Sequence, residues 1–170
     1  SKLFKGAILT GNIKNPVTRL FGDDLIDFSL NHKETGVLEN LENMLFQGEP
    51  VLKVLNAGNI KTLMAGSPRL RTWLARRIGL LKITPLDNIL KKLLFDNDFQ
   101  VRRFAVWSCG VLRIFSTVIN RIARMDPNPL VRATAVSASQ VFMKNPKEIP
   151  LWLKEAMSDP SPEVRVRAMA

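Results

Sequence analysis

Along most of this chain, apolar residues recur every three or four positions, which is the spacing of a helix with one buried face. The clearest runs predict long helices over 68–80, 99–112 and 129–143. Shorter helices are predicted between them, where apolar spacing resumes after a turn: one opens at Thr84-Pro85, and two others cover 116–125 and 150–157. No stretch alternates apolar and polar residues as a half-buried strand does. The pattern therefore predicts an all-α protein.

The start of each long helix, and of a fourth near the end of the chain, has a capping signal. A residue that can accept a hydrogen bond from the first free backbone N–H groups precedes the helix, and in three of four cases proline follows it. The four pairs are Ser67-Pro68, Asp98-Phe99, Asn128-Pro129 and Ser161-Pro162.

Residues before 67 follow a weaker pattern. Glycines interrupt residues 1–36, which we interpret as an irregular N-terminal cap of short helices, with a loop over 32–36. A helix is predicted over 37–47. The pattern over 51–64 fits either one helix broken at Ala57-Gly58 or a degenerate, shortened repeat, because Pro50-Val51-Leu52-Lys53 resembles Pro68-Arg69-Leu70-Arg71.

The turn before each later long helix repeats one set of residues. An aspartate is followed six positions later by an arginine, and three positions after that by an alanine. Because such self-similarity marks stacked supersecondary units, the spacing indicates a repeat architecture. The sets are Asp96, Arg102 and Ala105; Asp126, Arg132 and Ala135; and Asp159, Arg165 and Ala168, with a partial echo at Arg71, where Ala65 replaces the aspartate.

These junctions, with the leucine-rich helices before them, resemble the HEAT-repeat family, in particular the short HEAT-like repeats of phycobilisome lyase-type proteins. The resemblance covers 67–170 well and 37–66 loosely, and it does not extend to 1–36. It implies a right-handed α-α superhelix (an α-solenoid) of stacked helix pairs over 37–170. The last helix presents Val164, Val166, Ala168 and Met169 rather than a polar cap, so we expect further repeats or a capping partner at the C-terminal end.

The resemblance also implies a structural role for the repeated charges. In the family they form a ladder between junctions, because the planar fork of arginine can hold a carboxylate and backbone carbonyls together. Since Arg71 lacks its aspartate, we expect the ladder to be weak at the first unit. The ladder residues are Asp96, Arg102, Asp126, Arg132, Asp159 and Arg165.

The net charge of +10 is unevenly distributed. Residues 61–125 carry 13 basic and 3 acidic side chains, whereas 1–60 carry 6 and 7, and 126–170 carry 6 and 5. A local positive field favours an anionic partner such as nucleic acid, an acidic protein surface or lipid headgroups. Solubility combined with structural arginines explains the same composition.

Part of this charge falls on the long helices, which line the concave side of such solenoids in the family. A basic concave surface with one aromatic side chain would suit base stacking or a protein partner. Alternatively, the tryptophan shields the seam between repeats. The outer faces of the short helices carry Lys91, Lys92, Arg121 and Arg124 and are interpreted as solvated. The concave surface is predicted to comprise Arg69, Arg76, Arg103, Trp107 and Arg113.

Catalytic and cofactor chemistry has little support in the sequence. His32 and Cys109 are the single histidine and cysteine, and no zinc set, nucleophile triad or glycine-rich phosphate loop can be assembled. Asp23, Asp24 and Asp27 are better explained by helix capping than by cation binding. We expect no cofactor and no metal. The lone cysteine and the lack of a signal-peptide or membrane-spanning pattern fit a cytoplasmic protein.

Three functions remain open. The first is a non-catalytic binding or scaffold module that presents a solenoid surface to a protein partner. The alternative is nucleic-acid binding through the basic concave surface in 61–125. A lyase- or chaperone-like accessory role is permitted by the repeat subtype, although no residue demands it.

Overall fold

A computed structural model describes residues 32–170 of the chain. Residues 1–31 of the predicted N-terminal cap, including the aspartates at 23, 24 and 27, lie outside the described part. Within 32–170 the regular structure is helical and contains no strand, which confirms the all-α prediction for this part. The chain divides into two compact units, Ser1–Leu70 and Arg71–Ala170, and each is described by itself.

In the first unit, helix α2 (His32–Phe46) begins earlier than the sequence pattern predicted. Residues 32–36 form its first turn instead of a loop. Glu34 stabilises this start because a carboxylate is favourable near the positive end of the helix dipole. Its Oε2 also accepts a hydrogen bond of 2.7 Å from the hydroxyl of Ser67.

The helix predicted over 51–64 is split into α3 (Val51–Val54) and α4 (Ala57–Ala65). The break falls just before the predicted Ala57-Gly58, because Asn56 acts as the N-cap of α4. Its side chain accepts a hydrogen bond of 2.9 Å from the backbone N–H of Asn59. Val54, Leu55 and Leu63 are completely or almost completely buried in this unit.

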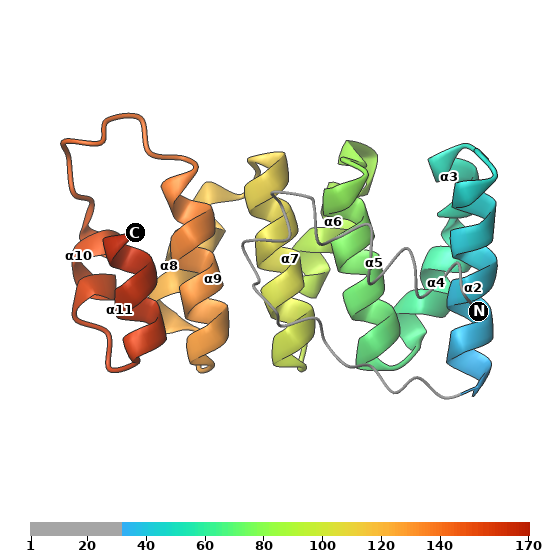
Figure 1. The fold of residues 1–170 in the computed structure, drawn as a ribbon, viewed down its shortest axis with the longest axis horizontal. Coiled ribbons are helices and arrows are strands. Elements are labelled where there is room, and N and C mark those ends of the chain that lie inside the picture. The colour runs from blue at the N-terminus through green and yellow to red at the C-terminus, as the bar shows by residue number, and fades with distance from the viewer. Residues whose placement is uncertain (1–31) are drawn as a thin grey trace. The chain divides into compact units, whose positions relative to one another are not determined.

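The second unit is shown in Figure 1 as a series of helix pairs that follow one another along the chain. Helix α5 (Pro68–Leu80) begins in the first unit and continues into the second. The predicted bounds agree closely, except that the helix expected to reach 143 ends at Gln140. The elements after α5 are η2 (Thr84–Leu86), α6 (Asp87–Leu93), α7 (Phe99–Leu112), α8 (Ser116–Met125), α9 (Pro129–Gln140), α10 (Leu151–Met157) and α11 (Pro162–Met169).

Two of the predicted caps are present as hydrogen bonds. The side chain of Asp98 accepts from two backbone N–H groups in the first turn of α7, and Asn128 does the same for α9. Ser161 makes no side-chain cap for α11, contrary to the sequence prediction. Its backbone N–H instead donates to Asp159 Oδ1 at 2.9 Å.

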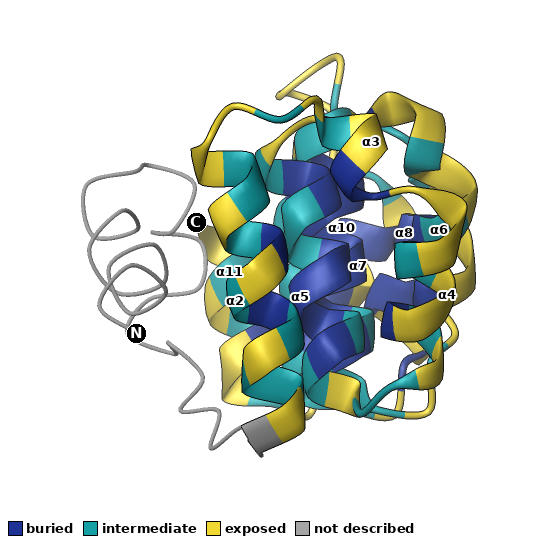
Figure 2. Ribbon diagram, turned by 90° about the vertical axis from the view of Figure 1, so that its right-hand side faces the viewer, coloured by how far each residue is buried: buried dark blue, intermediate teal, exposed yellow. Residues whose placement is uncertain are grey.

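The helices of the second unit pack in two layers. Helices α7, α9 and α11 lie side by side, while α8 and α10 lie behind them and each contacts the long helix that follows it (Figure 1). Buried residues, coloured dark blue in Figure 2, lie between these layers, and most of them are apolar. The core of this unit therefore needs neighbouring pairs to be complete.

Two glycines allow the long helices to approach each other closely. A Cβ atom added to Gly79 would lie 2.3 Å from Ser108 Oγ and 2.9 Å from its Cα. At Gly110 an added Cβ would lie 2.9 Å from the Cβ of Ala138. Ser108 uses this proximity to donate a hydrogen bond of 2.6 Å to the carbonyl oxygen of Ala75.

Within residues 32–170, no helix combines the length and the apolar character that crossing a membrane requires.

Candidate functional site

The repeated arginines connect consecutive helix pairs. Arg102 Nε donates to Asp126 Oδ2 at 2.8 Å, and its Nη2 donates to Oδ1 at 3.1 Å. Its Nη1 donates to the backbone oxygens of Asp96 and Asn97 at 2.9 and 3.2 Å. The guanidinium thus bonds the junction of its own pair and the aspartate of the next. With side chains only 13% and 6% exposed, this pair is well shielded from solvent.

Arg132 repeats this geometry one helix pair later in the chain. Its Nε and Nη2 both lie 2.9 Å from the carboxylate oxygens of Asp159, and Nη1 donates to the backbone oxygens of Asp126 and Pro127. At the start of the series, Arg71 donates to Asp96 at 2.7 and 3.1 Å.

The expectation of a weak ladder at Arg71 is therefore wrong. Each of these arginines pairs with the aspartate of the following helix pair. The alanine at position 65 therefore does not deprive Arg71 of its carboxylate partner. Residue spacing does not reveal this direction, because each aspartate lies nearer in the chain to the arginine of its own junction.

Each ladder aspartate also orders its own turn. Its Oδ1 accepts a hydrogen bond of 2.9 Å from the backbone N–H two residues later, at Asp98, Asn128 and Ser161. Burial alone would raise the pKa of Asp159, but the hydrogen bonds from Arg132 and Ser161 and the nearby positive charges lower it below its usual range. The same contact raises the pKa of Arg132.

Arg165 makes only half of this set of contacts. Its Nη1 donates to the backbone oxygens of Asp159 and Pro160 at 2.7 and 3.1 Å. Among the described residues no carboxylate bonds its guanidinium.

The residues of the predicted concave surface are placed differently from one another. Arg69 and Arg76 are half-buried on α5, and Arg113 is exposed at the C-terminal end of α7, with a left-handed backbone (φ 56°). Arg103 and Trp107 of this surface are each only 3% exposed. Their side chains are thus covered, which differs from the exposure that direct contact with a partner requires. Their role in binding stays a prediction.

Part of the positive charge of residues 61–125 is engaged within the protein. Arg71 and Arg102 are paired with aspartates, and Arg124 on the outer face pairs with Glu155 at 2.5 Å. Lys91 lies 5.8 Å from the centre of the Phe115 ring. Structural arginines therefore account for some of the local charge. This is what the second interpretation, solubility combined with structural arginines, predicted.

Cys109 is completely buried in α7. Burial, followed by the negative charge of Asp87, raises the pKa of its thiol to about 12. Such a thiol is protonated at neutral pH and is a poor nucleophile. Within residues 32–170 no group of three or more histidine, cysteine, aspartate or glutamate side chains is arranged to hold a metal ion.

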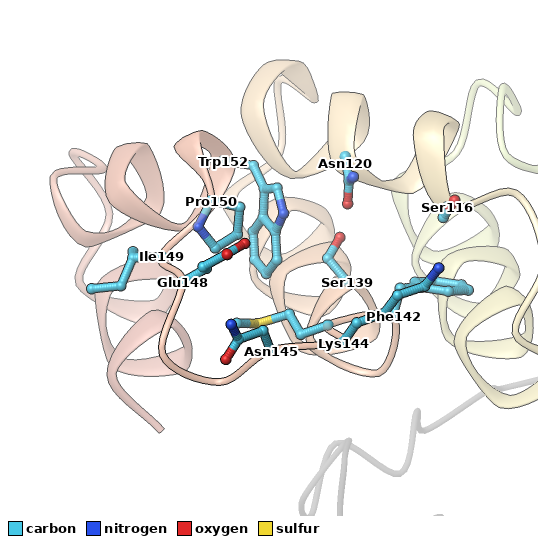
Figure 3. Close-up of a pocket in the computed structure, with 11 residues that line it drawn as sticks. Ser116, Asn120, Ser139, Phe142, Lys144, Asn145, Glu148, Ile149, Pro150 and Trp152 are labelled. Carbon is cyan, nitrogen blue, oxygen red and sulfur yellow. The ribbon is translucent and has the colours of Figure 1, made fainter.

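A pocket that the sequence reasoning did not identify lies at the end of the α8–α9 pair opposite the ladder. It has a volume of about 590 Å³ and is walled by α8, the end of α9, the connection over 141–150 and the start of α10 (Figure 3). The side chains of Asn120 and Ser139 point toward each other across it. The lining residues are Ser116, Asn120, Ser139, Phe142, Met143, Lys144, Asn145, Glu148, Ile149, Pro150 and Trp152.

Two polar oxygens of this pocket are unusual. Asn120 Oδ1 and Ser139 Oγ are buried without a hydrogen-bond partner. Ser139 is 1% exposed, and eleven residues after the N-cap it occupies the position that Ile78 and Cys109 take in α5 and α7. A polar residue in one repeat at a position that is otherwise apolar was the signal in the sequence that identifies this site.

Comparisons with models of protein families, with curated proteins and with solved structures find no match for this chain.

Proposed function

We propose that the chain is a non-catalytic scaffold that binds a protein partner, built as a right-handed α-solenoid of HEAT-like helix pairs. The observation that carries this proposal is the repeated bridge between helix pairs. Arg71, Arg102 and Arg132 each bind the aspartate of the next helix pair. Bidentate bonds of this kind fix the angle between neighbours. A rigid array of helix pairs offers an extended surface, which is the property that such repeats provide to partners.

The absence of assembled chemistry among the described residues also supports a binding role. The thiol of Cys109 is held in its protonated form, and the carboxylates of the ladder are engaged in structural bonds. The fold alone does not decide function, since such repeats serve many purposes.

The proposal is tested by affinity capture with a pair of matched variants. Arg113, at the end of α7, belongs to the predicted concave surface, and Arg121 lies on the outer face of α8; both are exposed. We expect the wild-type protein to retain a partner in stoichiometric amount, Arg113→Glu to lose it, and Arg121→Glu to keep it. Equal retention by both variants, or no stoichiometric partner, would contradict the proposal.

Nucleic-acid binding through residues 61–125 is the second candidate, supported by the exposed lysines and arginines that the ladder does not use. Titration of duplex and single-stranded oligonucleotides at two salt concentrations separates it from the first. Binding to duplex that weakens with a log–log slope of about −0.9 per phosphate contact would favour this candidate. We expect no saturable binding. The lyase- or chaperone-like role gains no support from a specific residue.

A further inference from the structure

The pocket at the end of the α8–α9 pair combines space with unmet hydrogen-bonding capacity. Buried polar atoms in folded proteins almost always have partners, because an unpaired one has lost its bonds to water without replacement. Here the two atoms, Asn120 Oδ1 and Ser139 Oγ, come from different helices and have almost no accessible surface, and their side chains line the pocket and point toward each other (Figure 3). A ligand that supplies both bonds would remove the penalty at both atoms.

The rest of the array shows that the helix pair does not need these polar residues for packing. Six residues before the ladder aspartate, where this pair has Asn120, the neighbouring pairs have Leu90 and Leu153, which are both buried. At the position of Ser139, the earlier long helices have Ile78 and Cys109, also buried. Polar side chains thus replace apolar ones at two positions of a single pair, and the two positions meet in the pocket.

The chemistry of the pocket favours a neutral amide. Asn120 Oδ1 accepts a hydrogen bond, and the hydroxyl of Ser139 donates one. A peptide group presents one N–H and one carbonyl, which matches this pair. Apolar walls that would suit an aliphatic side chain come from Phe142, Met143, Ile149, Pro150 and Trp152.

The charges at the pocket argue against a phosphate-bearing ligand. Its lining includes one basic residue, Lys144, and one acidic residue, Glu148, so it carries no net charge. A phosphate would need additional donors or cations. A nucleotide is therefore a poorer match than a peptide.

We propose that this pocket binds a short extended peptide segment of the protein partner. Because both oxygens are closed to solvent in the unliganded protein, the two side chains turn into the pocket when the segment binds. A backbone N–H of the segment then donates to Asn120 Oδ1, a backbone carbonyl accepts from the hydroxyl of Ser139, and a neighbouring apolar side chain packs against Trp152. This proposal rests on the proposed function, because it assigns a site to the same protein partner.

The test is a titration of the full ¹⁵N-labelled chain with N-acetyl-leucyl-leucinamide, followed by NMR. We expect saturable shifts at the amide signals of Asn120 and Ser139 and at the indole N–H of Trp152. The matched ester, in which oxygen replaces the central peptide N–H, should bind about fivefold more weakly because the donor to Asn120 is lost. Absence of shifts at these residues, or equal affinity for the two probes, overturns the proposal.

A double variant, Asn120→Leu with Ser139→Cys, installs the residue types that the neighbouring pairs carry. We expect it to fold with an unchanged or higher Tm and to lose the dipeptide, whereas Lys147→Gln, on the same connection but outside the pocket lining, should keep it. Retained binding by the double variant would show that the probe binds elsewhere. A lowered Tm would show that the polar pair supports the fold, for example through bound water, and would equally overturn the assignment.

Adenosine serves as the probe for the competing class of ligand. Tighter binding of adenosine than of the dipeptide would overturn the peptide assignment in favour of a base. If the dipeptide fails while capture through Arg113 succeeds, only the pocket assignment is lost. If capture fails as well, the proposed function is lost with it.

Discussion

The two ends of the α8–α9 helix pair differ in whether their buried polar groups are hydrogen-bonded. At one end, Asp126 accepts bonds from Arg102 and from the backbone N–H of Asn128, so both of its oxygens are used. At the other end, Asn120 and Ser139 each bury an oxygen that has no partner. The first arrangement recurs along the chain. Buried side-chain oxygens without a partner also occur at Thr72 and Gln100, but the pocket of the α8–α9 pair is lined by two such residues.

A similar contrast separates two buried serines of the long helices. Ser108 donates to the carbonyl of Ala75 in the neighbouring helix, whereas Ser139 faces the pocket. Because a buried polar group stabilises a fold only when it is bonded, the paired groups serve assembly of the array. Packing of the helix pairs does not supply bonds to the unpaired groups, whereas the proposed ligand would supply them.

The largest expected effect is at the ladder. Arg102→Ala removes a bidentate partner of a buried carboxylate and two bonds to carbonyls, and we expect it to lower the free energy of unfolding by about 3 kcal/mol. Arg165→Ala removes only the carbonyl bonds of a guanidinium that no described carboxylate contacts, and it should cost about 1 kcal/mol or less. Urea unfolding followed by circular dichroism measures both. Similar losses would show that the bridge to the next helix pair contributes little to the free energy of unfolding.

The next effect concerns the close contact between α5 and α7. Gly79→Ala places a methyl group against the backbone of Ser108, so we expect a loss of about 2 kcal/mol. Gly36→Ala is the matched control, since nothing lies within 4 Å of its added Cβ in α2, and it should raise stability by up to about 1 kcal/mol. The same unfolding experiment applies. A neutral Gly79→Ala would mean that the helices separate without penalty.

A smaller effect is expected from pH. The pKa of Asp159 is lowered in the folded protein, so its contribution to stability is present above its unfolded pKa of about 3.9 and is lost as pH falls through the folded pKa. Asp159→Asn should therefore be less stable than wild type at pH 7, and the difference should shrink as pH falls below about 4. Unfolding curves measured across this range test the sign. A difference that grows on acidification would contradict it.

The smallest effect is expected at the pocket. Ser139→Cys replaces a buried hydroxyl that has no partner by the residue found at the same position of α7, and it should leave the unliganded protein unchanged or more stable by up to about 1 kcal/mol. Ser108→Cys is the control, because it breaks the bond to Ala75 and should destabilise. Thermal unfolding of both variants completes the comparison between bonded and unbonded serines.

The sequence predicted the helices of the second unit well because their limits are set locally. Caps such as Asp98 and Asn128 act within one turn, and the apolar spacing is regular between them. Where the signal was weaker the bounds shifted, as at His32, where a predicted loop is the first turn of α2.

The contacts between helix pairs were beyond sequence reasoning because they depend on distances across the fold. The junction pattern named the ladder residues, but only the structure shows that Arg71 reaches Asp96, 25 positions away. The faces of α7 were also assigned from spacing alone, and spacing does not reveal that Arg103 and Trp107 are covered. The pocket joins residues of α8, α9 and α10, and no single stretch of sequence contains it.

Direct Arg–Asp bridges lock consecutive helix pairs together. A double-mutant cycle with Arg102→Met and Asp126→Asn measures the bridge itself, because effects that each substitution has elsewhere cancel. We predict a coupling of about 2 kcal/mol in the free energy of unfolding, with the double variant more stable than the sum of the single losses implies. A coupling indistinguishable from zero would show that the bridge does not hold neighbouring helix pairs together.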